Sequence, residues 1–476
     1  MNRTLDQAQS LSVQRAQVEF HNFASFGQPE RNLRIYAEEN QRRAEVIRAH
    51  REFIGEMTPF LEIGANAGHT SYMLANDFGA RGFALDLSAD SLRHGRALMD
   101  AWGLQRAPVR VAGDALHLPF ADESLRMVCT FQTLSQFMNI GSVLEEVVRV
   151  LQPGGVFLFA EEPLLRALSL RLYRCPYFAS MKPWERKLYD WGLIGYLVRD
   201  VIGADQEESF GIRQNHSLDL KGWRELVAKY FVAHELNVFV PERGWGERWV
   251  KRAAIRLDPH GSEWRAARLL GGTLAGVCRK AGDSTPRGFN RFEDFLRCPD
   301  CHSQMALDQQ GTLACIRCLY RAPNEGEVYN LLPSKSRREL YPGEREDIID
   351  FSLASHAKHL LDGWYEIEGV FGNKYRWIGA SASATLQRVD VGQQKLRIRG
   401  YASGHGIPGE VRVDVNGAQA GSWKLTRPGI FVLEAPVEDC ETYRIDIHAS
   451  PEWSVPTDDR SFTVNISMIR LVRSAE

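Results

Sequence analysis

Hydrophobic and polar positions change their spacing several times along the 476-residue chain. Residues 34–56 carry apolar side chains at helical spacing, among them Ile35 and Ile47, and we expect an N-terminal helical cap over 1–57. Short apolar runs then alternate with helical patterns. The runs that predict strands are 60–64, 82–87, 109–115, 125–132 and 154–163. This alternation is typical of βαβ units, so the fold class that we expect is α/β, with a Rossmann-like parallel sheet.

The period changes to two from about residue 355. Val411, Val413 and Val415 alternate with polar residues, and Asn416-Gly417 predicts a hairpin turn. We therefore expect a C-terminal antiparallel β-sandwich. The stretches 282–288 and 335–347 have the composition of linkers. The predicted domains are a cap at 1–57, an α/β domain at 58–281 with an insert at 164–240, a small cysteine-containing domain at 290–335 and a sandwich at 355–476.

Composition and charge narrow the choice of partners. The chain has 58 Lys and Arg residues against 60 Asp and Glu residues, so nucleic acid is not the partner that its net charge of -2 suggests. Residues 1–20 lack the apolar segment of a signal peptide, and we expect a cytoplasmic protein. The segment 164–200 interleaves basic and aromatic residues. A substrate lid, peripheral contact with the inner membrane and RNA binding all remain open for it, with the lid preferred.

A glycine turn follows the first predicted strand. Glu62-Ile63-Gly64-Ala65-Asn66-Ala67-Gly68 leads from an apolar strand into a helix, where backbone N–H groups can approach a ligand closely. The Gly-x-x-x-Gly spacing differs from the G-x-G-x-x-G of dinucleotide sites. Asp86 ends the next strand, where an acidic residue suits ribose hydroxyls. Asp114 follows the third strand and could accept a hydrogen bond from an adenine amino group.

Residues 58–163 resemble the class I S-adenosylmethionine-dependent methyltransferase family. The resemblance lies in four motifs and their order: ExGxxxG, LD, GDALHLPFADESLRMV and LEEVVRVLQPGG. The resemblance implies a seven-stranded, mostly parallel sheet with a reversed last strand, and S-adenosylmethionine as cofactor. It implies that Glu62 and Gly64 face the methionine part, Asp86 and Leu87 the ribose, Asp114 and Ala115 the adenine, and Phe131 and Gln132 the sulfonium. The full set expected to bind the cofactor is Glu62, Gly64, Ala65, Gly68, Asp86, Leu87, Asp114, Ala115, Phe131 and Gln132.

Candidate catalytic residues come from two places. Many small-molecule members of the family carry two His residues after the fourth strand, but Ser135-Gln136 stands there in this chain. Glu161 and Glu162 follow the fifth strand at the edge of the sheet where ligands bind, and His216 precedes a predicted helix. A surface carboxylate pair and a histidine beside a helix cap are the alternative interpretations.

Two tight cysteine pairs indicate a metal site. Cys298 and Cys301 precede Cys315 and Cys318 with 13 residues between the pairs, and four thiolates suit tetrahedral Zn²⁺. The sequence RCPDCHSQMALDQQGTLACIRCLYRAPNEGEVYNLLP resembles the Trm112-like zinc-binding domain. That resemblance implies a zinc ribbon with a structural metal.

The C-terminal features Gly363-Trp364-Tyr365, Arg376-Trp377 and Asp458-Asp459-Arg460 resemble a sandwich domain that is appended to enzymes of bacterial surface-polysaccharide pathways. Trp364 and Trp377 could stack on sugars or pack in the core. The function expected is an O-methyltransferase that acts on a sugar hydroxyl in cell-surface glycan biosynthesis, with a nucleotide sugar, a lipid-linked glycan or a polymeric glycan as acceptor. An RNA or protein methyltransferase and a non-catalytic glycan-binding scaffold are the alternatives.

Overall fold

The computed structural model describes residues 29–164, 218–239, 272–285 and 288–473, together with 183–184, 187 and 255–256. Isolated positions within these ranges that it leaves out are 138, 352, 371, 372, 427, 428 and 457. The described residues fall into two compact units, and the boundary between them in the sequence lies between Arg337 and Arg338.

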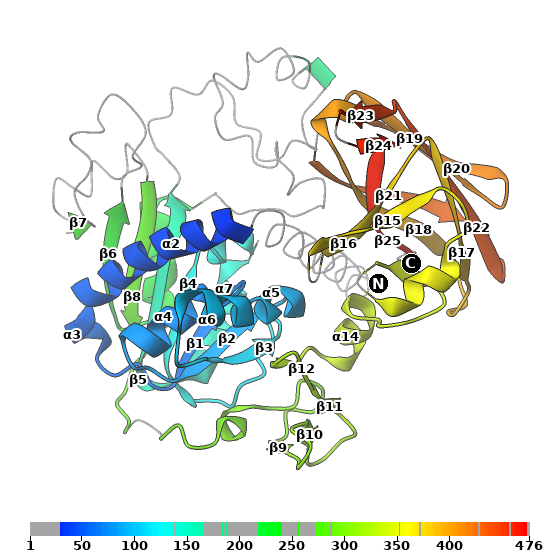
Figure 1. Ribbon diagram of the computed structural model, residues 1–476. Helices are drawn as coiled ribbons and strands as arrows, with labels where there is room; N and C mark the ends of the chain where they lie inside the picture. Colours follow the sequence, from blue (N-terminus) through cyan, green and yellow to red (C-terminus); the bar gives the residue numbers. More distant parts are fainter. Residues whose placement is uncertain are drawn as a thin grey trace. The chain divides into compact units, whose positions relative to one another are not determined.

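The first unit is built around a large twisted sheet (Figure 1). Its central strands have the order β3-β2-β1-β4-β5-β8-β6, and β8 runs antiparallel to both of its neighbours. The bounds are β1 Phe60–Ile63, β2 Gly82–Asp86, β3 Val109–Ala112, β4 Leu125–Phe131, β5 Leu151–Leu164, β6 Ala233–Phe239, β7 Ile255–Arg256 and β8 Gly272–Arg279. β7 lies beside β6 at one edge. The predicted Rossmann-like sheet with a reversed strand is therefore confirmed.

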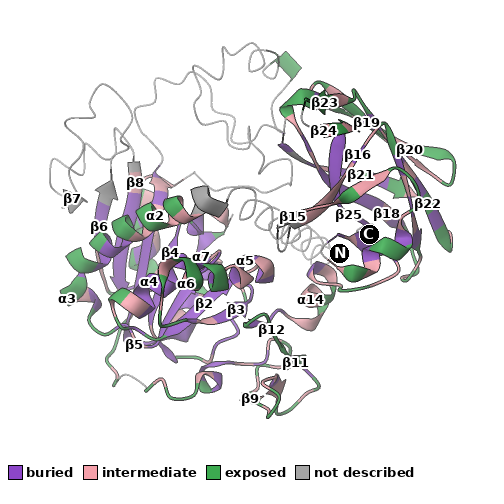
Figure 2. Ribbon diagram, in the orientation of Figure 1, coloured by how far each residue is buried: buried purple, intermediate pink, exposed green. Residues whose placement is uncertain are grey.

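Helices cover both faces of this sheet because successive strand residues point to opposite sides. Leu61 and Ile63 of β1 pack in one core with α7 and α11, whereas Phe60 packs in another core with α2 and α4. The bounds are α2 Pro29–Ala49, α3 Arg51–Ile54, α4 His69–Asp77, α5 Ala89–Arg93, α6 Gly95–Trp102, the 3-10 helix η1 Leu134–Gln136, α7 Ile140–Val150 and α11 Leu220–Tyr230. Figure 2 shows the buried strands between helices whose outer surfaces are exposed.

The cysteine-containing segment adds strands to the same sheet. β13 (Val328–Asn330) pairs in parallel with β3, with Val328 opposite Arg110, and β12 (Asn324–Glu325) pairs with β13. The small sheet of this segment consists of β9 Met305–Leu307, β10 Leu313–Cys315 and β11 Arg321–Ala322, after the 3-10 helix η3 Phe292–Phe295. Met305, Leu313 and Tyr320 are buried in one core with the α/β sheet. Within the described residues the main sheet thus has ten strands, three more than the resemblance implies.

The charged run at 335–347 is not a plain linker. Helix α14 (Ser334–Leu340) occupies its first half, and β14 (Ile348–Asp350) follows it. Leu340, at the end of this helix, is buried. Because the rest of the helix is mostly charged and polar, its composition indicated a linker.

The second unit is an antiparallel sandwich, as predicted. One sheet has the order β15-β16-β25-β18-β21, with β14 beside β25, and the other has the order β17-β22-β19-β20. The bounds are β15 Trp364–Val370, β16 Asn373–Ile378, β17 Ser381–Gln387, β18 Gln394–Ala402, β19 Gly409–Val415, β20 Ala418–Leu425, β21 Gly429–Val437, β22 Thr442–Ser450, β23 Trp453–Val455, β24 Asp458–Phe462 and β25 Val464–Arg473, with 3-10 helices η4 Ala354–His359 and η5 Gly404–Gly406. Ile398 and Ile466 meet Val413 and Ile447 in its core.

The hairpin predicted at Asn416-Gly417 joins β19 to β20. Both residues have positive φ, 51° and 81°, as a type I′ turn requires. In the part of the chain that the structure describes, no helix is long and apolar enough to cross a membrane.

Candidate functional site

The glycine turn has the backbone shape that a cofactor loop needs. Gly64 and Gly68 have φ values of 72° and 81°, a region that other residues adopt rarely. A Cβ atom on Gly64 would lie 2.3 Å from Thr133 Oγ1, so the loop after β4 also requires a glycine there. Gly68 is the N-cap of α4 and provides no side-chain cap. In the first turn, the backbone N–H of Ser71 donates to the Glu62 carboxylate. The N–H groups at this end of the helix suit an anionic ligand group.

Two carboxylates follow at the same edge of the sheet. Asp86 ends β2, and its two oxygens accept hydrogen bonds of 2.8 Å from the backbone N–H groups of Asn66 and Ser88. Asp114 follows β3 and accepts one of 2.9 Å from the N–H of Leu116. Both carboxylates are largely buried and held in fixed orientations, and Leu87 and Ala115 are adjacent to them in the chain. These two hydrogen-bond acceptors fit the ribose hydroxyls and the adenine amino group of S-adenosylmethionine.

Glu62 lies on β1 with 1% of its surface exposed. Burial raises the pKa of its carboxyl group to about 7, while a 2.5 Å hydrogen bond from Ser71 and the positive charge of Arg43 act in the opposite direction. A group with a pKa near neutrality can ionise when a cation binds beside it. Glu62 therefore fits the ammonium group of the methionine part.

The loop after β4 is held by Glu162. This carboxylate is fully buried and accepts hydrogen bonds of 2.9, 2.9 and 3.0 Å from the N–H groups of Thr133, Leu134 and Ser135. It holds the loop that follows Phe131, the last residue of β4. A catalytic role for Glu162 stays a prediction, but the observed contacts are those of a positioning residue.

Glu161 has different surroundings from its neighbour. Its backbone is left-handed, with φ 65°, and its carboxylate accepts hydrogen bonds of 3.1 and 2.8 Å from Nε and Nη2 of Arg43. Arg42 lies 3.5 Å from the other oxygen. Because 13% of the Glu161 side chain is exposed at the carboxyl end of β5, this carboxylate is the member of the pair that can reach a ligand.

Arg43 is a site residue that the sequence did not indicate. It lies on α2, is 4% exposed, and stacks over the ring of Phe131 at 4.7 Å. His69 Nε2 lies 2.6 Å from Arg43 Nη1 and 2.9 Å from Glu39 Oε2, and the ring of Tyr36 stacks on His69 at 4.2 Å. Helix α2 thus contributes a charged cluster beside the predicted sulfonium position. The Glu39–Arg43 spacing of four was its sole signal in the sequence.

His216 lies outside the described residues, as do most of the insert at 164–240 and residues 1–28 of the cap. Its proposed catalytic role remains a prediction.

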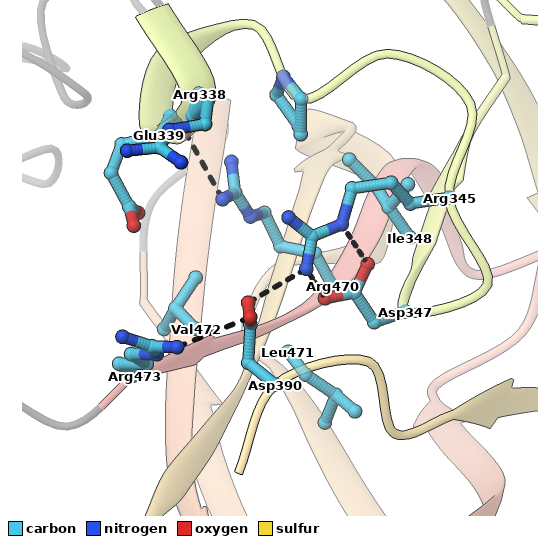
Figure 3. Close-up of a pocket in the computed structure, with 11 residues that line it drawn as sticks. Arg338, Glu339, Arg345, Asp347, Ile348, Asp390, Arg470, Leu471, Val472 and Arg473 are labelled. Carbon is cyan, nitrogen blue, oxygen red and sulfur yellow. Dashed lines mark hydrogen bonds and ion pairs between the residues drawn. The ribbon is translucent and has the colours of Figure 1, made fainter. Parts of the chain in front are cut away.

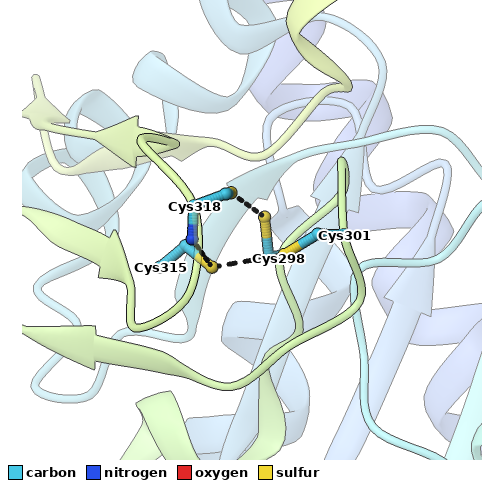
Figure 4. A group of neighbouring side chains, drawn as sticks. All are labelled: Cys298, Cys301, Cys315 and Cys318. Carbon is cyan, nitrogen blue, oxygen red and sulfur yellow. Dashed lines mark hydrogen bonds between the residues drawn. The ribbon is translucent and has the colours of Figure 1, made fainter.

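The four predicted metal ligands come together (Figure 4). Their sulfur atoms lie within 4.8 Å of one another, with 3.6 Å between Cys298 and Cys318 and 3.4 Å between Cys301 and Cys315. Sulfurs of a tetrahedral zinc thiolate centre lie roughly 3.8 Å apart. The backbone N–H groups of Arg317 and Cys318 point at the Cys315 sulfur, at 3.3 and 3.4 Å. The donor set and its spacing fit Zn²⁺.

A pocket lies wholly within the sandwich unit, apart from the residues that are predicted to bind the cofactor (Figure 3). Its charges compensate one another, since Arg345 pairs with Asp347 and Asp390, and Arg473 also pairs with Asp390. It offers no nucleophile and no cofactor loop, so we assign it no catalytic part.

Comparison with known proteins finds a family that resembles the segment with the glycine turn. Residues 61–159 match the family model described as a methyltransferase domain. The matched residues include the glycine turn, Asp86 and Asp114.

Individual relatives match shorter stretches of the chain as well. The chain is 26% identical over 128 residues to norajmaline N-methyltransferase of Rauvolfia serpentina, which covers 27% of this chain and 41% of that protein. It is 33% identical over 102 residues to fatty-acid O-methyltransferase of Mycolicibacterium smegmatis, which covers 21% and 36% respectively. The chain thus spans less than half the length of these curated relatives.

Among solved structures, a SAM-dependent methyltransferase from Methanosarcina mazei aligns with 16% identity and a TM-score of 0.30, over 49% of this chain and 97% of that one.

Proposed function

We propose that this protein is an S-adenosylmethionine-dependent O-methyltransferase whose acceptor is a sugar hydroxyl of a bacterial cell-surface glycan. The observation that carries the methyltransferase part is the succession of groups at one edge of the sheet. The Gly64–Gly68 turn, Asp86 and Asp114 follow three adjacent parallel strands, β1, β2 and β3. Ligands of α/β sheets bind at this edge.

The cofactor, when bound, supplies a methyl group activated by its sulfonium. Asp86 would hold the ribose diol, because its oxygens are already aimed by two backbone N–H groups. Asp114 would accept from the adenine amino group, and Glu62 would face the methionine ammonium. The N-terminal end of α4, which begins after Gly68, suits the methionine carboxylate. The protein's own contribution is to position donor and acceptor for an in-line displacement.

A hydroxyl acceptor is helped by a base that takes its proton. Glu161 is our first candidate, since it is partly exposed at the ligand-binding edge and is oriented by Arg43. His216 is the second candidate. Glu162 contributes by fixing the loop after β4.

The sugar acceptor is supported by the resemblance of the C-terminal sandwich to domains of surface-polysaccharide enzymes. A small lipophilic acceptor is a second candidate, because one relative is named as a fatty-acid O-methyltransferase. The alignment with that relative covers 21% of this chain and 36% of that protein, so we rank this acceptor below the sugar.

We also propose a structural zinc ion at Cys298, Cys301, Cys315 and Cys318. All four positions of a tetrahedral ion are filled by thiolates, so the site leaves no open position for catalysis. The ion would hold together a segment whose core is continuous with that of the methyltransferase domain.

The test is methyl transfer from labelled S-adenosylmethionine to nucleotide sugars, lipid-linked glycans, fatty acids and bulk tRNA. We expect label in a sugar, and at least a hundredfold loss in an Asp86→Ala variant that stays folded. Label in fatty acids alone would support the second candidate. Label in tRNA alone would overturn both, and the absence of cofactor binding by calorimetry would favour the non-catalytic scaffold.

A further inference from the structure

A cluster of aromatic side chains lies in the sandwich unit, outside its main core. We define it as Tyr365, Tyr375, Trp377, Trp453 and Phe462. The rings come from β15, β16, β23 and β24, and the centroid of Phe462 lies 5.8, 5.4 and 5.1 Å from those of Tyr365, Trp377 and Trp453. Phe462 is buried, whereas the other four rings are half-buried. The cluster therefore presents aromatic surface around a buried centre.

These rings face away from the core of the sandwich. Ile378 is fully buried in that core, so Trp377, its neighbour on β16, points to the opposite side of the sheet. Packing in the sandwich core therefore accounts for an apolar residue at position 378, but not for the indole at Trp377. A partly exposed indole on the outer face of a sheet is a candidate for ligand contact.

The ring orientations are fixed by hydrogen bonds. The Trp453 indole N–H donates to the Thr463 carbonyl at 3.1 Å, and the Tyr365 hydroxyl donates to the Ser461 carbonyl at 2.8 Å. Trp377 meets Trp453 edge to face, with an interplanar angle of 87°. Rings that are already ordered lose little conformational freedom when a ligand stacks on them.

Polar groups with fixed positions border the rings. Arg460 lies over Phe462 and Tyr365, at 4.8 and 5.4 Å, and its guanidinium pairs with Asp458 and Glu368. His405, which is exposed, lies 5.3 Å from Trp453. Binding sites that combine apolar surface with a few oriented polar groups are typical of small ligands.

A sugar ring matches this combination better than a peptide does. One side of a pyranose presents C–H groups that can stack on an indole, and its rim presents hydroxyl groups that both donate and accept. The cluster offers aromatic faces instead of aliphatic side chains, with carboxylates and a guanidinium beside them. We infer that this aromatic cluster binds a sugar residue of a glycan chain. For the identity of the glycan the inference rests on the proposed function, but the binding itself does not require methyl transfer.

Such a site would raise the concentration of a polymeric acceptor near the enzyme. A second binding module on the same chain makes the next encounter intramolecular. Loss of the cluster should therefore raise the KM for a polymeric glycan and leave kcat unchanged. The KM for a nucleotide sugar, which is too short to use both modules, should not change.

The direct test applies the full-length protein, without cofactor, to an array of immobilised microbial polysaccharides. We expect binding to at least one polysaccharide, with at least tenfold lower affinity for Trp377→Ala and recovery in Trp377→Tyr, which keeps an aromatic face. Trp423→Ala is the matched control, because it removes a half-buried indole from β20 in the other sheet. Circular dichroism and thermal unfolding verify that each variant is folded.

The outcomes separate the two proposals. No binding to the array, or equal losses in Trp377→Ala and Trp423→Ala, would overturn the inference even if the enzyme methylates a sugar. Binding that depends on Trp377, in a protein that methylates no sugar, would support the inference and overturn the proposed acceptor.

Discussion

At the level of single residues, the buried carboxyl group of Glu62 couples the stability of the protein to pH. Its pKa is raised from 4.5 to about 7 by burial, so the folded state holds a proton more tightly than the unfolded state. The stability that this proton contributes is complete below pH 4.5 and is lost as pH rises towards 7. The shift corresponds to a loss of about 3 kcal/mol at most.

We therefore predict that Glu62→Gln removes part of this pH dependence. Urea unfolding at about pH 5 and about pH 8 should show the wild type losing stability between the two, by up to about 3 kcal/mol more than the variant. The same variant should bind S-adenosylmethionine at least tenfold more weakly, because it cannot ionise beside the ammonium group. Glu56→Gln, at an exposed position before β1, is the control and should match the wild type. Identical pH slopes for the wild type and Glu62→Gln would contradict the assignment.

Arg42 and Arg43 provide a matched pair for the charged cluster on α2. Both contact Glu161, but the side chain of Arg43 is 5% exposed and that of Arg42 is 57% exposed. Removing one partner of a buried ion pair leaves an uncompensated charge, so Arg43→Ala should cost about 3 kcal/mol of unfolding free energy. Arg42→Ala should cost less than about 1 kcal/mol. Chemical denaturation measures both, and equal losses would show that the network is not a buried unit.

Predictability from sequence differs among these residues. Asp86 and Asp114 could be found because each follows its own strand directly, and strand ends are visible in the apolar pattern. Arg43 could not be found, since its partner Glu161 is 118 positions away and becomes a neighbour when α2 packs on the sheet. Glu161 and Glu162 also form an indistinguishable pair in the sequence. The left-handed backbone at Glu161 places the two carboxylates in different surroundings.

At the level of elements, the strand β13 explains why the cysteine segment and the methyltransferase sheet share a core. Three residues, Val328 to Asn330, pair with β3, and Arg110 forms an ion pair with Glu327 next to them. A strand of three residues has too little periodicity to be predicted. The strands β1, β2 and β4, which have four, five and seven residues, could be predicted because most of their residues are apolar and each run is followed by a helical pattern.

Metal removal should therefore destabilise more than the ribbon. We predict that the purified protein holds one zinc ion per chain, and that Cys298→Ser with Cys301→Ser abolishes it. Because Cys298, Met305 and Tyr320 lie in the core of the α/β sheet, the double variant should also lower the unfolding temperature of that domain. Atomic absorption and calorimetry measure the two effects.

Cys440→Ser is the control for this experiment, since Cys440 packs against the sandwich core. It should keep the zinc ion and the wild-type unfolding temperature of the α/β domain. Wild-type protein that is free of zinc after gentle purification would contradict the metal site. Zinc loss without any change in the unfolding of the α/β domain would contradict the shared core.

At the level of the whole molecule, the chain combines two units with separate cores. Among the residues that the structure describes, those of the sandwich core, with Ile398, Val413 and Ile447, all come from positions 349–471. The period-two pattern after residue 355 predicted this second core directly. The joint between the units was harder to predict, because α14 fills much of a charged run with helix.

Separate cores should unfold separately. We predict two transitions in calorimetry of the full chain, since cooperative unfolding follows a continuous core. Ile447→Ala leaves a cavity at a fully buried position of the sandwich and should lower one transition, at a cost of about 2–5 kcal/mol. Chelation of zinc should lower the other transition alone. A single transition that both treatments shift would instead mean that the two units unfold as one, and glycan bound at the sandwich would then stabilise the methyltransferase domain as well.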